Sequence, residues 1–300
     1  MLPLPVPAAV PVRSILNISE ISFMETIILN SCSKINIGLN VLRKRSDGFH
    51  DIETIFYPVK LCDTISFKKS DEFRFFSNNS TLVDDSNNLI IRAKNKIEEL
   101  TEEKVKAEIT LAKYIPLGSG LGGGSSNAAC TLKGLNMLYD LNLSEPRLKK
   151  ISLELGSDVP FFLKSSPCYG TGRGEDLEEI KLKINQPILI INPRIHISTK
   201  WAFENVTPVI RDVPIKEIIK KDITAEDFRQ YFTNDFEDVV SKVYPEIGLI
   251  KTLMYSSGAL FSSMSGSGST VYGIFSTLEK AREVQKYFKD YLSFIHYEDL

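Results

Sequence analysis

The chain has 300 residues, of which 43% are hydrophobic and 25% are charged, and its formal net charge is -2. These values are typical of a globular protein with room for two domains or one large α/β unit, so they exclude a wholly disordered chain. The nearly neutral charge provides no field that attracts a polyanion, which argues against nucleic acid as a partner. No segment reaches the about 20 apolar residues of a transmembrane helix. We therefore expect a cytoplasmic protein.

The four cysteines lie far apart in the sequence and form no C-x-x-C pair; they are Cys32, Cys62, Cys130 and Cys168. The chain has only three histidines, and no spacing typical of a zinc site is present. Because nothing in the sequence indicates an oxidising compartment, we expect four reduced, mostly buried thiols.

Residues 1–24 differ in composition from the rest of the chain. Four prolines fall among the first eleven residues, which argues against a helix. No basic stretch precedes the apolar run, so neither a signal peptide nor a transit peptide is indicated. We predict that these residues form an extension outside the fold.

Strand patterns follow as far as about residue 76. KINIGLNV (34–41) alternates between apolar and polar residues, which predicts a half-buried strand with Ile35 and Ile37 on its apolar face. SDGFH (46–50) contains the Asp-Gly pair that favours a hairpin, and DIETIFYPV returns as a second strand. DTISFKK and EFRFF resemble further short strands.

Helices and one more strand follow in the middle of the chain. Residues 88–100 have helical spacing, and residues 105–111 alternate like a strand that leads into the glycine-rich stretch PLGSGLGGGSSNAA (116–129). The helix after the glycines has Ser125 or Ser126 as its expected N-cap. The next helix is expected from Ser144 to Gly156.

The composition changes near residue 166, where a turn-rich stretch precedes a new set of strands. We expect helices at 225–243 and 246–257, two strands around the turn of SMSGSGS (263–269), and a late amphipathic helix in LEKAREVQKYFKDYL. Two α+β halves, residues 25–165 and 166–300, are the simplest account of this order.

The glycine-rich stretch is the clearest functional signal. A strand, a glycine-rich loop and a helix in succession aim backbone N–H groups at an anion such as phosphate. The P-loop pattern is excluded because no lysine follows the glycines. Gly118, Gly120 and Gly123 formally match the dinucleotide pattern G-x-G-x-x-G, but Asp140, near the offset of its acidic residue, ends a helix and not a strand. A glycine hinge without a ligand is the remaining alternative.

PLGSGLGGGSS resembles the phosphate-binding motif of the GHMP kinases, the superfamily of galactokinase, homoserine kinase, mevalonate kinase and phosphomevalonate kinase. Four further motifs follow the order and spacing of this family: GSDVPFF (156–162), GTGRGE (170–175), NDFE (234–237) and SMSGSGS. The resemblance implies a two-domain α+β fold with the active site in the cleft between the domains. It also implies an ATP-dependent small-molecule kinase with Mg²⁺, whose protein ligand is unknown, Ser126 being one candidate. The implied ATP-binding residues are Pro116, Leu117, Gly118, Ser119, Gly120, Leu121, Gly122, Gly123, Gly124, Ser125 and Ser126.

The resemblance implies that Lys34 and Asp158 carry the chemistry. Asp158 would accept the proton of the attacking hydroxyl, and Lys34 would hold the aspartate ionised and neutralise developing charge. Without the resemblance, Asp158 has the pattern of a helix N-cap and Lys34 that of a solvent-facing strand lysine.

The implied acceptor is 4-diphosphocytidyl-2-C-methyl-D-erythritol of the non-mevalonate isoprenoid pathway, phosphorylated at its 2-hydroxyl. Phe49 would stack on the cytosine and His50 would bind its edge, although both could simply belong to a hairpin. The implied substrate-binding residues are Asn36, Phe49, His50, Thr199 and Phe203, with Trp201 an alternative to Phe203. The SGSGS turn would close over the ligands. A kinase for a mevalonate-like or homoserine-like alcohol and a catalytically idle nucleotide-binding protein are the alternatives.

Overall fold

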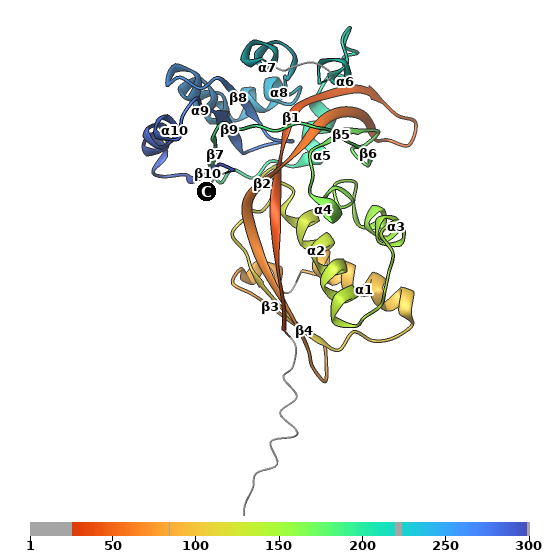
Figure 1. Ribbon diagram of the computed structural model, residues 1–300. Helices are drawn as coiled ribbons and strands as arrows, with labels where there is room; N and C mark the ends of the chain where they lie inside the picture. The colour runs from red at the N-terminus through yellow and green to blue at the C-terminus, as the bar shows by residue number, and fades with distance from the viewer. Residues whose placement is uncertain (1–25, 84, 220–223, 299–300) are drawn as a thin grey trace, which may run out of the picture.

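The computed structural model describes residues 26–83, 85–219 and 224–298. The predicted N-terminal extension lies outside the described residues. Two sheets form the framework, one with six strands and one with four. The long strands β1 (Thr26–Lys44) and β2 (His50–Lys69) extend from the half of the molecule that holds α1 to α4 into the half that holds the second sheet (Figure 1).

The first sheet is built on the antiparallel hairpin of β1 and β2, in which Lys44 pairs with His50 around the predicted turn. Its other strands are β3 (Arg74–Ser77), β4 (Ala107–Ala112), β5 (Cys168–Thr171) and β6 (Asp176–Glu179), in the order β3-β4-β2-β5-β6. DTISFKK is not a separate strand, because β2 is continuous from His50 to Lys69 and pairs with β1 on both sides of an irregularity at residues 60–61.

β1 is buried on both faces from Ile35 to Val41, not half-buried as predicted. Ile35 and Ile37 pack in one apolar cluster, whereas Leu39 and Val41 pack in another. The pairing register shifts at Gly38, whose φ of +66° suits glycine, so the strict alternation is interrupted there.

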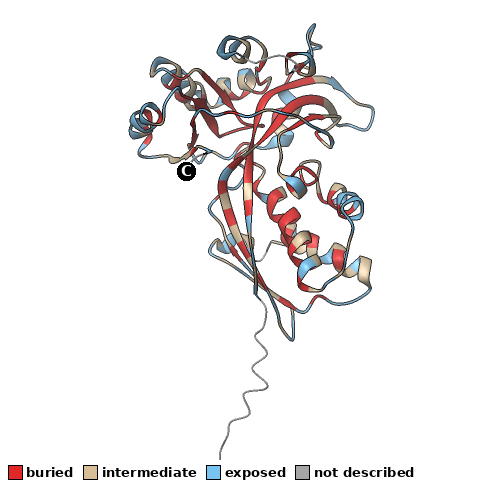
Figure 2. Cartoon of the chain, viewed as in Figure 1, coloured by how far each residue is buried: buried red, intermediate tan, exposed pale blue. Residues whose placement is uncertain are grey.

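Helices α1 to α4 share one apolar core with the first sheet; they are α1 (Leu89–Thr101), α2 (Gly123–Leu138), α3 (Glu145–Leu155) and α4 (Phe161–Lys164). A short 3₁₀ turn, Ser80–Leu82, precedes α1. α2 is the most buried helix of this layer (Figure 2). Its N-cap is Gly122, so the expectation of a serine cap is wrong: Ser125 and Ser126 lie inside the first turn. α3 begins after Ser144 and ends at Gly156, as predicted.

The second sheet is antiparallel with the order β10-β7-β9-β8; its strands are β7 (Ile188–Asn192), β8 (Phe261–Met264), β9 (Val271–Ile274) and β10 (Leu292–His296). The sequence did not predict β10. The helices of this half are α5 (Thr199–Asn205), α6 (Ile215–Ile218), α7 (Ala225–Tyr231), α8 (Glu237–Val243), α9 (Pro245–Ser256) and α10 (Leu278–Gln285), which runs into a 3₁₀ turn, Lys286–Phe288. None of the described helices is long and apolar enough to cross a membrane.

The predicted helix at 225–243 is two helices, α7 and α8. The backbone between them contacts β1, because Thr233 O accepts a hydrogen bond from Leu39 N. Asn234 Nδ2 donates to the carbonyl oxygens of Met264 and Gly266. These non-helical contacts explain the break.

The two sheets meet through a shared apolar cluster that includes Ile35 and Ile55 of the first and Ile190 and Tyr272 of the second. The chain changes sheets between β6 and β7, since β5 pairs with β2 in the first sheet. The chain therefore does not change sheets at residue 166. The predicted boundary between the two domains at this residue stays a prediction.

The prediction of four reduced thiols is wrong for two of them. Cys32 and Cys62 lie opposite each other on β1 and β2 and form a disulfide. Neighbouring strands bring together side chains that are 30 residues apart in the sequence. Cys130 and Cys168 are free and buried, as expected.

Candidate active site

The glycine-rich stretch forms a loop between β4 and α2, as its sequence predicts. Gly118, Gly120 and Gly122 all have positive φ, between +58° and +77°, a conformation that favours glycine. The first N–H groups of α2 have no acceptor within the helix, and together with the helix dipole they favour an anion at this end.

The loop is held against the second half of the molecule. A Cβ atom on Gly120 would lie 2.0 Å from the carbonyl oxygen of Ser265. A Cβ atom on Gly118 would lie 2.4 Å from Nδ1 of His196. The Ser265 hydroxyl donates to Gly120 O at 2.9 Å, and Thr270 N donates to Ser119 O at 3.2 Å. The SGSGS turn thus contacts the glycine loop directly.

A cavity of about 350 Å³ lies beside the loop. Its lining includes nine of the predicted ATP-binding residues: Pro116, Leu117, Gly118, Ser119, Gly120, Gly122, Gly123, Gly124 and Ser125. Leu121 and Ser126 do not line this cavity. The Ser126 hydroxyl donates to Cys32 O at 2.7 Å and accepts from Ser31 Oγ at 2.8 Å, so it is bound within the fold and is not aimed at a ligand.

Lys34 and Asp158 line the same cavity and face each other, with Nζ and Oδ2 at 3.6 Å. Lys34 is 3% exposed and does not point to solvent. Its ammonium also donates to Asn36 Oδ1 at 2.5 Å and to Gly120 O at 3.1 Å. Burial lowers the pKa of Lys34, and the charge of Asp158 opposes this shift. Lys34 thus ties β1 to the glycine loop and to the turn that carries Asp158.

Asp158 is not a helix cap, because α4 begins after Pro160. It lies in the turn between α3 and α4, and its side chain is 34% exposed. A carboxylate beside a buried cation, partly open to a cavity, is placed to accept a proton from a bound hydroxyl.

Asn36 is fixed by partners from three parts of the chain. Its Nδ2 donates to Thr54 Oγ1 at 3.0 Å, and its backbone N–H donates to the Ser265 hydroxyl at 3.1 Å. Its carbonyl accepts from the Tyr272 hydroxyl at 2.9 Å. Asn36 also lines the cavity at the loop. Its side chain therefore both orients Lys34 and borders the space for a ligand.

A second cavity of about 680 Å³ adjoins the first. Phe49, His50, Thr199 and Phe203 all line it, so the structure brings together four of the five predicted substrate residues. The rings of His50 and Phe203 stack with centroids 5.2 Å apart. Burial, with Lys44 nearby, lowers the pKa of His50, which favours the neutral imidazole. Trp201 instead packs against Tyr244.

The two cavities share Asp158, Arg173, Thr199 and Phe203 as lining residues. A ligand on the glycine loop and another on the aromatic wall would therefore meet at Asp158. This arrangement suits a transfer between two bound molecules.

Comparison with known proteins agrees with this geometry. The family descriptions "GHMP kinases N terminal domain" and "GHMP kinases C terminal" match residues 88–166 and 215–293. The chain belongs to the GHMP kinases. It is 41% identical to the 4-diphosphocytidyl-2-C-methyl-D-erythritol kinase of Prosthecochloris aestuarii over 87% of this chain and 94% of that protein. It is equally similar, at 41%, to the enzyme of the same name from Bacteroides thetaiotaomicron, over 81% and 90% of the two chains.

Solved structures show the same relationship. A crystal structure of 4-(cytidine 5'-diphospho)-2C-methyl-D-erythritol kinase superposes with a TM-score of 0.77 at 27% identity, covering 90% of this chain and 98% of that chain. Homoserine kinase from Cytophaga hutchinsonii, at 18% identity and a TM-score of 0.67, shares the fold over 92% and 95% of the two chains. As a GHMP kinase, the chain is a small-molecule kinase that uses ATP as phosphate donor.

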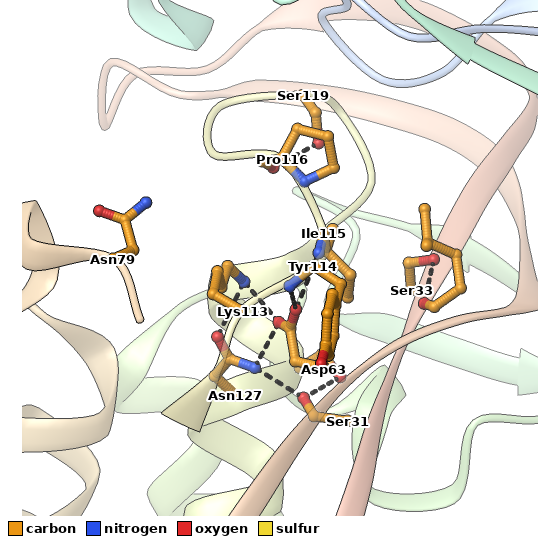
Figure 3. A network of polar contacts seen from close by, with 12 residues as sticks. Ser31, Ser33, Asp63, Asn79, Lys113, Tyr114, Ile115, Pro116, Ser119 and Asn127 are labelled. Carbon is orange, nitrogen blue, oxygen red and sulfur yellow. Dashed lines mark hydrogen bonds and ion pairs between the residues drawn. The ribbon is translucent and has the colours of Figure 1, made fainter. Parts of the chain in front are cut away.

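The GHMP kinase loop rests on a buried polar network that sequence reasoning missed (Figure 3). Asp63 of β2 is fully buried and accepts hydrogen bonds from Tyr114 N at 2.7 Å and Ile115 N at 2.8 Å. Its other oxygen accepts from Lys113 Nζ at 2.5 Å and Asn127 Nδ2 at 2.9 Å. One carboxylate thus holds both the entry to the loop and the first turns of α2.

Arg173 was also missed as a site residue, although its motif GTGRGE was noted. The turn between β5 and β6 brings it to the junction of the two cavities. No periodicity in the sequence signals such a position, because it depends on β5 pairing with β2.

Proposed function

We propose that this GHMP kinase transfers the γ-phosphate of ATP to the 2-hydroxyl of 4-diphosphocytidyl-2-C-methyl-D-erythritol in the non-mevalonate isoprenoid pathway. The observation that carries the proposal is the wall of Phe49, His50 and Phe203 in the cavity that shares Asp158 with the glycine loop. Aromatic rings and a neutral imidazole suit a nucleobase, through stacking and hydrogen bonding to its edge. Mevalonate and homoserine have no base to occupy such a wall. The names of the relatives support the same acceptor.

In the proposed reaction, the ATP phosphates bind at the loop and at the first turn of α2. The acceptor oxygen forms a bond to the γ-phosphorus while the bond from that phosphorus to the bridging oxygen of ADP breaks, and the hydroxyl proton passes to Asp158. Lys34 stabilises the negative charge on the transferred group and orients Asp158 through their ion pair. Asn36 fixes the Lys34 ammonium in this position.

Magnesium is part of the proposal because ATP carries it. The described residues contain no group of three or more His, Cys, Asp or Glu side chains that could form a protein cage for a metal. Mg²⁺ bound to nucleotide phosphates usually needs only one or two protein oxygens and keeps several waters. Ser125, which lines the loop cavity, offers such an oxygen and would hold the ion, which would neutralise phosphate charge.

We further propose that the enzyme acts in the cytoplasm, where glutathione and thioredoxin keep most thiols reduced. The partners we propose are small molecules only, with no nucleic acid.

The acceptor assignment is tested by calorimetric binding of CDP and of ADP to the same protein. We expect CDP to bind with ADP already present at saturation, because the two nucleotides occupy different cavities. Competition between them at a single site, or no binding of CDP, would contradict the proposed acceptor.

A further inference from the structure

Arg173 lies in a turn whose shape is fixed by its neighbours. Gly172 and Gly174 on either side have φ of +68° and +102°, which other residues rarely adopt. Ile52 N donates to Gly172 O at 2.7 Å, and Gly174 N donates to Thr171 O at 2.9 Å. A Cβ atom on Gly174 would lie 3.2 Å from the Phe56 ring. The backbone that carries Arg173 is therefore anchored to β2.

The guanidinium of Arg173 is held at one end. Nε donates to Glu175 Oε1 at 3.1 Å, and the planar group lies over the ring of Phe49, 4.8 Å from its centroid. Within the described part of the chain its only ion pair is the one with Glu175, through Nε. Both Nη groups are left to donate to a ligand, and the side chain remains 33% exposed.

The position of this cation is specific. Four described residues line both cavities: Asp158, Arg173, Thr199 and Phe203. Arg173 is the only one of these four with a cationic side chain. Lys44 and Lys200 line the aromatic cavity alone, as does Glu204, whereas Lys34 lines the loop cavity alone. Arg173 thus stands between the base wall and the reacting carboxylate.

We propose that Arg173 binds the diphosphate of the acceptor substrate. This inference rests on the proposed function, since it takes the acceptor to be a nucleoside diphosphate ester. In such a molecule the diphosphate joins the base to the alcohol, so it must span the distance from Phe49 to Asp158. Arg173 contacts the ring of Phe49 and lines the cavity wall with Asp158. A guanidinium whose two Nη groups have no ion-pair partner among the described residues matches paired phosphate oxygens.

The test compares cytidine, CMP and CDP as calorimetric ligands for the wild type and for Arg173→Met. We expect the wild type to bind CDP more tightly than cytidine. In Arg173→Met the ratio of the CDP affinity to the cytidine affinity should fall about 10- to 100-fold. This range corresponds to the loss of hydrogen bonds to charged groups. Cytidine and ADP affinities should stay within about twofold of wild type. In Arg173→Met the apparent KM for the full acceptor should rise in parallel with the dissociation constant for CDP. The kcat should change little.

A matched control is Arg74→Met. Arg74 Nε also donates to a glutamate two residues away, Glu72 Oε1 at 3.0 Å, but Arg74 lies on β3 and lines neither cavity. Arg74→Met should leave the affinities for cytidine, CMP and CDP unchanged. Arg173→Lys serves as a second variant with the charge retained, in case Arg173→Met does not fold, and it should lose part of the CDP preference.

The outcomes separate the possibilities. Equal losses of affinity for cytidine and for CDP in Arg173→Met would mean that Arg173 only supports Phe49. A loss of affinity for ADP would mean that Arg173 contacts the phosphate donor. Either result, or unchanged CDP binding, would overturn the inference while leaving the proposed function intact. A wild type that binds neither cytidine nor CDP would overturn both.

Discussion

At the scale of single residues, the site depends on side chains that the fold holds in unusual surroundings. Lys34 is a buried ammonium whose partners come from β1, the glycine loop and the turn after α3. The sequence indicated its role only through resemblance, because an isolated strand lysine normally faces solvent. Its ammonium donates to Asn36 and to Gly120, and the alternation of β1 cannot reveal the contact with Gly120.

Asp158→Asn should lower kcat about 100- to 10,000-fold, the range for loss of a general base. The amide keeps the size of the side chain but cannot accept the hydroxyl proton. ATP affinity, measured by calorimetry, should stay close to wild type, because the glycine loop is untouched. A variant that keeps most of its turnover would remove Asp158 from the mechanism.

Phe49→Ala should raise the apparent KM for the acceptor about five- to hundredfold, since stacking on a base contributes about 1–3 kcal/mol. The KM for ATP should not change. Phe76→Ala is the control: Phe76 is 49% exposed against 52% for Phe49 and lines neither cavity. A larger effect on ATP than on the acceptor would show that the base cavity is wrongly placed.

At the scale of elements, the strand, loop and helix around residue 116 could be predicted from sequence, because glycine spacing and apolar periodicity are local signals. The supports of the loop could not. Asp63 is separated from Lys113 by 50 residues and is brought to it only by the pairing of β2 with β4. The N-cap was misplaced for a related reason: the positive φ of Gly122 starts α2 before its serines.

Gly120→Ala should abolish detectable ATP binding or weaken it severely. Its new Cβ would meet the Ser265 carbonyl oxygen at 2.0 Å, and its φ of +77° is strained for alanine. Backbone must move to relieve that contact, which displaces the loop from the SGSGS turn. Gly248→Ala is the matched control, because Gly248 lies in α9 with only ordinary contacts at 3.5 Å and beyond. Normal ATP binding by Gly120→Ala would contradict this account of the loop.

Asp63→Asn should lower the free energy of unfolding by about 3–5 kcal/mol, because it leaves Lys113 as a buried cation without its counter-ion. Chemical denaturation would measure the loss. The double variant Asp63→Asn/Lys113→Met should recover part of it by removing the unpaired charge. If the single variant were as stable as wild type, the network would not support the loop as described.

At the scale of the whole molecule, the active site exists because both halves contribute to it. β1 and β2 supply Lys34, Asn36 and His50, and the second half supplies Thr199, Phe203 and the SGSGS turn. Much of the order of strands and helices was predictable, but β5, β6, β10, the short helices α4 to α6 and the break between α7 and α8 were not. The break depends on contacts with β1 and with the SGSGS turn, which lie far away in sequence.

The most direct test of the central claim is ATP turnover with Mg²⁺, offering 4-diphosphocytidyl-2-C-methyl-D-erythritol beside mevalonate, homoserine and galactose. A phosphorus spectrum of the product and a parallel reaction with chelator complete the measurement. We predict a new phosphomonoester on the cytidine substrate alone, and no product when Mg²⁺ is chelated. Turnover of another alcohol, with none of the cytidine substrate, would contradict the account.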